Sequence, residues 1–138
     1  MMKISEIMTR DVQTVHPGQT LREVANMMAN IDSGAILVNS EDRLVGMITD
    51  RDIVIRAVAK GESCDTPISG VMSSDIRYCF DDQEVDEVAR NMADIQMRRL
   101  PVVNRDKRLV GVVSLGNIAK ACDSGANNTV LQGVAQAH

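Results

Sequence analysis

Residues 43–52 read RLVGMITDRD, and residues 108–117 read RLVGVVSLGN. The two stretches begin with the same four letters, continue with two apolar residues and a hydroxyl residue, and carry Asp52 or Asn117 three positions later. A short apolar run is typical of a buried strand, and a hydroxyl residue at its end indicates that a helix begins there. The same strand-to-helix junction is therefore predicted twice in the chain.

The repetition extends over nearly the whole sequence. A shift of 64 positions aligns the two copies at first, and a shift of 65 aligns the two junctions after one residue is gained in the second copy. The identities include Ile4-Ser5 with Ile68-Ser69, Met8 with Met72, Asp11 with Asp75, Glu23-Val24-Ala25 with Glu87-Val88-Ala89, and Met28-Ala29 with Met92-Ala93. Agreement at this many positions indicates an internal duplication.

Within each copy the hydrophobic period changes in the same order. An extended segment precedes an amphipathic helix, two apolar runs separated by a polar turn form a hairpin, and a second helix closes the copy. These elements are expected at 12–15, 21–31, 35–38, 44–49 and 50–60 in the first copy, and at 76–80, 85–95, 100–103, 109–114 and 115–123 in the second. The closing helices are expected to end near Gly61 and Gly125.

The first helix of each copy carries an apolar stripe with helical spacing. The stripes consist of Leu21, Val24, Ala25, Met28 and Ile31 in the first copy, and of Val85, Val88, Ala89, Met92 and Ile95 in the second. Thr20 and Glu23 predict a capping box for the first of these helices, whereas Asp81 or Asp82 is expected to cap the other.

A copy of this kind is too small to cover both faces of its own three-stranded sheet. We therefore expect an α+β fold of tandem β-α-β-β-α repeats, packed sheet face to sheet face with pseudo-two-fold symmetry. Repeat 1 is predicted to span residues 1–61, followed by a linker at 62–70, repeat 2 at 71–123, and a polar, partly disordered tail at 124–138.

Composition restricts the class of protein. The chain has 138 residues, of which 44% are hydrophobic and 25% charged, as in soluble globular proteins. The net charge is -4, and Tyr78 and Phe80 are the only aromatic residues, so binding to nucleic acid is disfavoured. No segment has the apolar core of a signal peptide or the roughly 20 apolar residues of a membrane span, so we expect a cytoplasmic protein without a membrane partner.

The cysteines and histidines predict neither a metal site nor a disulfide framework. Cys64, Cys79 and Cys122 form no C-x-x-C pair, and His16 and His138 are the only imidazoles. These spacings do not fit the usual zinc sites, and an odd number of distant cysteines fits a reducing compartment. Because no nucleophile, base and orienting group can be assembled, we expect a protein that is not an enzyme.

At this point the sequence resembles the CBS domain family in its paired form, the Bateman module. The resemblance covers about residues 4–123 and leaves no room for a fused enzyme, which implies a stand-alone pair. It is carried by Ile7-Met8, Val71-Met72, Thr14-Val15-His16-Pro17, Leu100-Pro101-Val102-Val103 and, above all, the G-h-x-T/S-x-x-D/N motifs at 46–52 and 111–117.

The resemblance implies a function as well as a fold. Members bind AMP, ADP, ATP, S-adenosylmethionine or similar ligands in clefts between the copies, and many are homodimers that regulate a partner protein. We accordingly expect a regulatory module with an adenosyl ligand and no cofactor. A ligand-independent dimerisation scaffold is the alternative.

The candidate site residues are those of the two junctions. Thr49 and Ser114 stand where a helix N-terminus favours a phosphate, and each hydroxyl adds a hydrogen-bonding group. Asp52 follows one turn later, where a carboxylate would accept both hydroxyl groups of a ribose, while the amide of Asn117 offers one acceptor oxygen. The resemblance assigns ribose and phosphate contacts to these four positions.

The same spacing has a purely structural interpretation. Thr49 with Asp52 is also close to a capping box, which would stabilise the helix by about 1 kcal/mol without any ligand. Ser114 with Asn117 offers the same alternative. The spacing alone leaves both interpretations open at each junction.

The remaining candidates are apolar residues and arginines. By resemblance, a purine would lie against apolar residues and backbone edges, with packing in the core as the alternative role for most of them; the candidates are Val15, Pro17, Ile36, Leu100 and Pro101. The run Ala35-Ile36-Leu37 replaces the proline in the first copy, and Asp81 replaces Pro17 in the second. Occupation of one cleft is therefore as consistent with the sequence as occupation of both. Arg51, Arg98 and Arg99 are the cations placed to bind a phosphate, with solvated surface arginines as the alternative for each.

Overall fold

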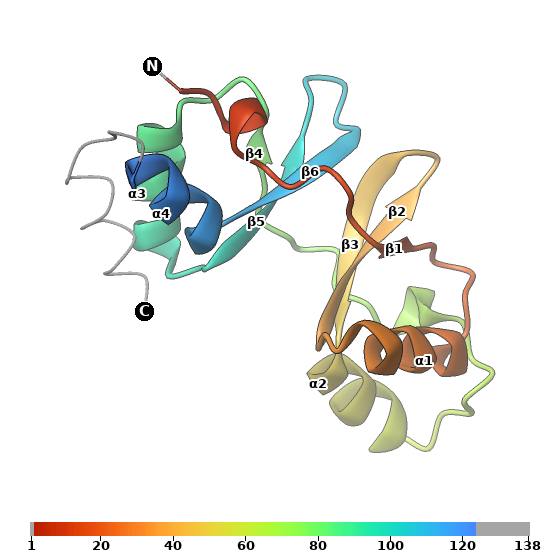
Figure 1. The fold of residues 1–138 in the computed structure, drawn as a ribbon. Helices are drawn as coiled ribbons and strands as arrows, with labels where there is room; N and C mark the ends of the chain where they lie inside the picture. Colours follow the sequence, from red (N-terminus) through yellow and green to blue (C-terminus); the bar gives the residue numbers. More distant parts are fainter. Residues whose placement is uncertain (1, 124–138) are drawn as a thin grey trace. The chain divides into compact units, whose positions relative to one another are not determined.

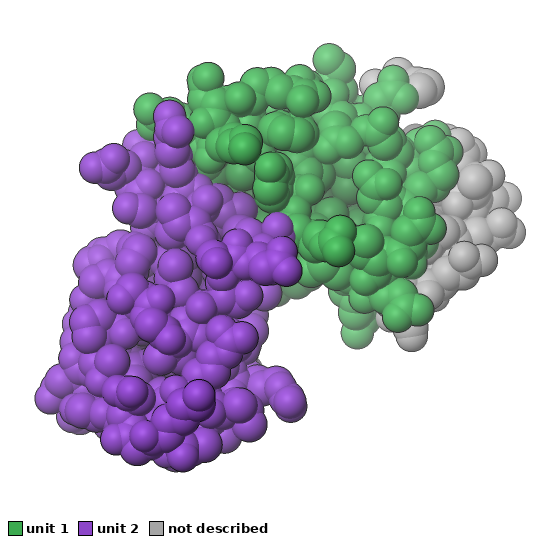
Figure 2. Space-filling model, turned by 180° about the vertical axis from the view of Figure 1, so that it is seen from behind, with its two compact units in different colours: residues 1–12, 77–138 green, residues 13–76 purple. Residues whose placement is uncertain are grey.

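The computed structural model describes residues 2–123, so the predicted tail at 124–138 and Gly125 lie outside the described residues. The chain divides into two compact units (Figure 2). Unit 1 joins Met1–Val12 to Arg77–His138, and unit 2 is Gln13–Ile76. These units are not the predicted repeats, whose boundaries were drawn from the duplicated sequence. The boundaries of the repeats stay a prediction.

Unit 2 contains the body of the first repeat (Figure 1). Its elements are strand β1 (Thr14–Val15), helix α1 (Leu21–Ile31), strands β2 (Ala35–Ser40) and β3 (Arg43–Thr49), helix α2 (Asp50–Ile53), a π-helical turn η2 (Val54–Val58) and a 3-10 turn η3 (Ile68–Gly70). The last of these lies inside the segment that was predicted to be the linker.

Unit 1 repeats this plan around the second copy (Figure 1). It contains a 3-10 turn η1 (Ile4–Glu6), strand β4 (Cys79–Phe80), helix α3 (Val85–Ile95), strands β5 (Arg99–Val103) and β6 (Leu109–Ser114), and helix α4 (Leu115–Asp123). The α+β prediction of two strand-helix-strand-strand-helix repeats is thereby confirmed. Their pseudo-two-fold packing stays a prediction.

Each unit has one mixed three-stranded sheet, with strand order β1-β2-β3 or β4-β5-β6. The first two strands of each sheet are parallel and the last two are antiparallel. The extra residue of the second copy lies in the hairpin turn. Glu41 and Asp42 form the first turn with φ of 53° and 66°, whereas the second turn runs from Asn104 to Arg108 and closes with the Asn104 N–H donating to the Arg108 carbonyl.

The core of each unit lies between its sheet and its helices. In unit 1, Val88 and Met92 of α3 pack with Val102 and Val113 of the sheet, and all four are fully buried. In unit 2 the corresponding cluster consists of Val15, Leu21, Val24, Met28, Ile36, Val38, Ile48, Ala57, Ile68 and Val71. Burial of these apolar side chains is the dominant driving force for each unit.

The first residues of each sequence copy lie in the compact unit formed mainly by the other copy. Residues 2–12 of the first copy lie in unit 1, and residues 68–76, with which the second copy begins, lie in unit 2. Thr9 pairs with Val112 along the free edge of β6, and Ser73 pairs with Met47 along the free edge of β3. We call residues 2–12 and 68–76 the exchanged segments. They come so close to the sheets that a Cβ at Gly46 would lie 2.5 Å from the Ser73 carbonyl oxygen. This close approach is why the junction motif needs a glycine at its start.

A single closing helix was predicted for 50–60, but in the structure the α-helix ends at Ile53 and a π-helical turn follows. After Ile53 the backbone hydrogen bonds span five residues in place of four. The Ala59 N–H donates to the Val54 carbonyl, and the Glu62 N–H donates to the Ala57 carbonyl. Such a π-helical turn accommodates one extra residue within a helix. The left-handed Gly61 that follows, with φ of 73°, is as predicted.

Two predictions about the first helices are wrong. Helix α3 begins after Glu84, whose side chain makes no capping hydrogen bond, so neither Asp81 nor Asp82 caps it. Ala25 is exposed although its counterpart Ala89 is fully buried, and Ile31 remains 39% exposed. In unit 1, Ile118 of the closing helix α4 shares a core with Ala89, whereas unit 2 closes with the short α2 and the π-helical turn η2, and Ala25 is not part of its core.

Candidate functional site

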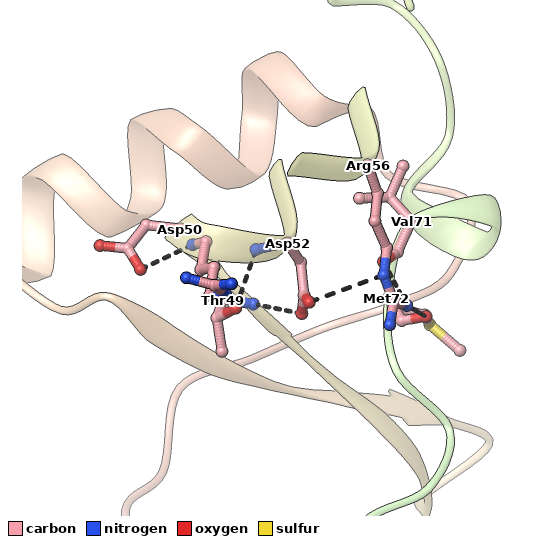
Figure 3. Close-up of polar contacts among 7 residues, drawn as sticks. Thr49, Asp50, Asp52, Arg56, Val71 and Met72 are labelled. Atoms are coloured by element: carbon pink, nitrogen blue, oxygen red, sulfur yellow. Dashed lines mark hydrogen bonds and ion pairs between the residues drawn. The ribbon is translucent and has the colours of Figure 1, made fainter. Parts of the chain in front are cut away.

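The first junction lies where β3 ends and α2 begins (Figure 3). The Asp52 N–H donates to the Thr49 hydroxyl oxygen at 3.0 Å, and the Thr49 N–H donates to Asp52 Oδ2 at 3.0 Å. The Asp50 N–H donates to the Gly34 carbonyl at 2.8 Å and so ties the junction to the start of β2. The predicted capping box is therefore present.

The capping box does not use every polar atom of the two side chains. The Thr49 hydroxyl accepts a hydrogen bond but donates none within residues 2–123. Asp52 Oδ1 lies 4.0 Å from Arg56 Nε, and the Asp52 side chain is 17% exposed. A hydroxyl proton and one carboxylate oxygen thus remain able to bind a polar ligand.

The second junction has the same backbone geometry with different chemistry. The Asn117 N–H donates to Ser114 Oγ at 3.2 Å, and the Ser114 N–H donates to Asn117 Oδ1 at 2.9 Å. In addition, the Ser114 hydroxyl donates to the same Oδ1 at 3.0 Å. The Ser114 hydroxyl proton is already donated to Asn117 Oδ1 within this capping box. A ligand would have to displace that hydrogen bond to accept from the hydroxyl.

The two junctions therefore share the capping role but differ in the polar groups that they leave for a ligand. Both junctions form the capping box, which is the structural interpretation. Only the first also keeps a hydroxyl proton and a carboxylate oxygen outside the box. The ligand role of all four residues stays a prediction.

The predicted arginines are exposed. Arg99 pairs with Ser114 across β5 and β6, so both side chains project from the same face of the sheet at the junction. The carbonyl of Arg98 accepts from the Leu115 N–H at 3.0 Å, and this bond anchors the start of α4. Arg51 lies beside Asp52 in α2 and is likewise exposed.

The predicted purine contacts are mostly core residues. Val15 and Ile36 belong to the core of unit 2 and Leu100 to that of unit 1, and all three are at most 3% exposed. They would offer a ligand their backbone rather than their side chains. Pro101 is buried next to Leu100, and Pro17 is half-buried, with its carbonyl accepting from the Ser69 N–H.

One residue at the first junction was missed by the sequence analysis. Arg56 approaches Asp52 one turn later in the helix and donates through Nη1 to the carbonyls of Val71 and Met72, at 3.4 and 3.5 Å (Figure 3). It links the junction to an exchanged segment. The spacing of four residues from Asp52 was the available signal.

The thiol of Cys79 is buried and lies outside the two junctions. Burial, assisted by the nearby Asp81, raises the pKa of the Cys79 thiol to about 12, so it is protonated at neutral pH and a poor nucleophile. Cys64 and Cys79 are free thiols. Within the described part of the chain no three His, Cys, Asp or Glu side chains come together in a way that could hold a metal ion, and no helix could span a membrane.

Comparison with known proteins identifies relatives over most of the chain. The CBS domain family matches residues 4–58 and 68–124. The CBS domain-containing protein YhcV of Bacillus subtilis is 40% identical over 119 residues, which are 86% of this chain and 84% of that protein. Hypoxic response protein 1 of Mycobacterium tuberculosis is 38% identical over 117 residues, covering 83% of this chain and 81% of that protein.

Solved structures show the same fold. Hypoxic Response Protein I, solved with two coordinated zinc ions, has a TM-score of 0.76 and 35% identity over 88% of this chain and 99% of its own. CBSX2 in complex with AMP has a TM-score of 0.75 at 20% identity, covering 90% of this chain and 98% of its own. A CBS domain pair solved with 5′-methylthioadenosine and S-adenosyl-L-methionine has a TM-score of 0.70 at 24% identity, covering 91% and 99%.

Proposed function

Because the chain belongs to the CBS domain family and carries two CBS domains in tandem, we propose that it is a non-catalytic regulatory module. It binds an adenine nucleotide or a related adenosyl ligand and signals to a partner protein. The clefts between the copies that the family resemblance implies stay a prediction. The ligand class is supported by two solved relatives of the same fold, one bound to AMP and the other to S-adenosyl-L-methionine and 5′-methylthioadenosine.

The observation that carries the proposal is a pair of polar groups at the first junction that lie outside the capping box, the Thr49 hydroxyl proton and Asp52 Oδ1. A ribose offers two neighbouring hydroxyl groups, and Asp52 Oδ1, which makes no hydrogen bond within residues 2–123, would accept one of them. The Thr49 hydroxyl would donate to a phosphate or carboxylate oxygen near the start of α2. Arg51 and Arg56 supply positive charge beside them.

The signal would pass through the contacts of the same junction. Arg56 bridges Asp52 to the carbonyls of Val71 and Met72, so a ligand that engages Asp52 competes with this bridge. The exchanged segment that follows is where a change in ligation would be transmitted. Such coupling requires that the ligand bind one arrangement of the segment more tightly than the other.

Thermal melts with AMP, ADP, ATP, S-adenosylmethionine and NAD test the proposal. A ligand that binds only the folded chain raises the melting midpoint with its concentration. We expect at least one adenosyl compound to do so. Asp52→Asn should weaken the affinity for that ligand at least about tenfold and so reduce the thermal shift. The ligand-free midpoint should stay unchanged, because Asn117 makes the same capping bonds in the second copy.

Thr49→Ala is the control for the structural role of the junction. It removes the acceptor of the Asp52 N–H and should lower the free energy of unfolding by about 1 kcal/mol. The ligand-free melting midpoint should fall accordingly. An Asp52→Asn chain that responds to every ligand as the parent does would refute the assignment of Asp52. Absence of any shift, in a chain that still self-associates, would instead favour the ligand-independent dimerisation scaffold.

A further inference from the structure

The two aromatic side chains of the sequence lie together in unit 1. Tyr78 directly precedes strand β4 and Phe80 belongs to it, and their ring centroids are 5.7 Å apart in an edge-to-face arrangement. Cys79, between them, is buried in the core of unit 1. Because successive side chains of an extended segment alternate in direction, both rings lie on the side of the sheet that faces away from that core.

A series of contacts holds the two rings in place. The Arg105 guanidinium lies over the Phe80 ring, 4.0 Å from its centroid, and donates to both carboxylate oxygens of Asp82 at 2.7 and 2.9 Å. Phe80 is half-buried, whereas Tyr78, at the end of this series, remains 40% exposed. An aromatic ring that is already held in place can bind a flat partner with little further loss of side-chain freedom.

The exposed ring lies near the second junction. The parallel register of β4 and β5 places Tyr78 beside Pro101. Arg99 lies two residues from Pro101 on β5, about 7 Å by the rise of a strand, and pairs with Ser114. Leu100, which separates Arg99 from Pro101, is buried in the core, so Arg99 projects on the same side of the sheet as Tyr78. An aromatic face, a cation and a hydroxyl group thus lie on one side of this sheet.

The first copy has no such ring. A shift of 64 positions aligns Tyr78 with Thr14 and Phe80 with His16. Conversely, the second junction lacks the carboxylate of Asp52, and its hydroxyl proton is donated within the capping box. The two copies therefore offer a ligand different groups, polar ones at the first junction and an aromatic face beside the second.

From this arrangement we propose that the exposed face of Tyr78 stacks on the purine base of a nucleotide whose phosphate lies toward Arg99. The inference rests on the proposed function and gives unit 1 a site of its own, at which the base contributes more to affinity than the ribose does. Stacking suits a base because every base has a flat π-face. The planar guanidinium of Arg99 suits a phosphate.

The fluorescence of Tyr78 tests the proposal directly. The chain has one tyrosine and no tryptophan, so its tyrosine emission comes from this ring alone. AMP should quench the emission saturably, whereas ribose 5-phosphate, which has the sugar and the phosphate but no base, should not. N-acetyltyrosinamide titrated with AMP corrects for light that the adenine absorbs. Tyr78→Trp, which can be excited where adenine does not absorb, should show the same saturable quenching.

Affinities measured by calorimetry test whether stacking stabilises the complex. In an Asp52→Asn background, which weakens binding at the first junction, Tyr78→Leu should lower the affinity for AMP at least about fivefold, because leucine is apolar but has no π-face. Tyr78→Phe should bind AMP more tightly than Tyr78→Leu does. Ile31→Ala is the matched control, because Ile31 is 39% exposed but lies on α1 in unit 2, and it should leave the affinity unchanged.

The results separate this inference from the proposed function. A thermal shift with AMP that leaves the emission of both Tyr78 and the Tyr78→Trp chain unchanged would overturn the inference and leave the proposed function standing. Equal affinities of the Tyr78→Leu and Tyr78→Phe chains would also overturn it, because the π-face would then contribute nothing. Saturable quenching by AMP, retained in the Asp52→Asn chain and absent with ribose 5-phosphate, would support a separate base-binding site in unit 1.

Discussion

The residue that follows the first helix of each repeat has a left-handed backbone conformation, which is unfavourable for a residue with a side chain. Asp32 follows α1 with φ of 54°, and Gln96 follows α3 with φ of 55°. The left-handed conformation brings Cβ close to the carbonyl oxygen and costs an ordinary residue about 1–2 kcal/mol. Asparagine and aspartate tolerate it better than glutamine does. The strain is therefore greater at Gln96.

We expect Gln96→Gly to stabilise the chain by about 0.5–1 kcal/mol, because glycine relieves the strain but is more disordered in the unfolded chain. Urea unfolding of the two chains measures the difference. Arg90→Gly is the matched control, since it lies inside the same helix and should destabilise by about 1 kcal/mol. A loss of stability with Gln96→Gly would contradict the interpretation.

At the scale of an element, the N-termini of α1 and α3 differ in their capping hydrogen bonds. Thr20 accepts from the Glu23 N–H and the Glu23 carboxylate accepts from the Thr20 N–H, which completes a capping box. Helix α3 has Glu87 at the matching position, but the side chain of Glu84 makes no capping bond. The hydrogen bonds that Thr20 donates to the Glu23 carboxylate also lower the pKa of Glu23, and the bond from the Thr20 backbone N–H has the largest effect.

Completing the second capping box should stabilise α3. Glu84→Ser supplies a hydroxyl oxygen for the Glu87 N–H, and we expect a gain of about 0.5–1 kcal/mol in the free energy of unfolding. Guanidinium unfolding followed by circular dichroism provides the measurement. Thr20→Ala, which removes the existing cap of α1, should lose a similar amount. Unchanged stability of Glu84→Ser would show that the terminus of α3 is satisfied in another way.

At the scale of the whole molecule, the exchanged segments join each unit from distant parts of the sequence. Ile4 is fully buried in the core of unit 1, beside residues that follow it by more than seventy positions. Ile68, its counterpart in the duplication, is fully buried in the core of unit 2. Each side chain therefore stabilises the unit that contains the other copy's sheet.

Hydrogen exchange can assign each exchanged segment to its unit. Ile4→Ala should cost about 2–4 kcal/mol and lower the protection of amides within 77–123, because the cavity opens in the core of unit 1. Ile68→Ala is the matched control, and it should lower protection within 13–58 instead. If Ile4→Ala loosened the amides of 13–58 preferentially, the exchange of segments would be wrong.

The repeated order of strands and helices could be predicted from the sequence, because it depends on periodicity and on contacts a few residues apart. The bonds between Thr49 and Asp52, and between Ser114 and Asn117, follow from a spacing of three residues at a helix start. Local geometry of this kind is the same in almost any tertiary setting. The sequence thus determined the two junctions and the elements on either side of them.

Only the tertiary structure decided what surrounds those elements. The placement of Ile4 in unit 1, the bridge from Arg56 to the Val71 and Met72 carbonyls, and the exposure of Ala25 all depend on residues distant in the sequence. A hydrophobic period states that a side chain is to be buried, but not against which part of the chain. That choice is made by the packing of the whole unit, which no single segment encodes.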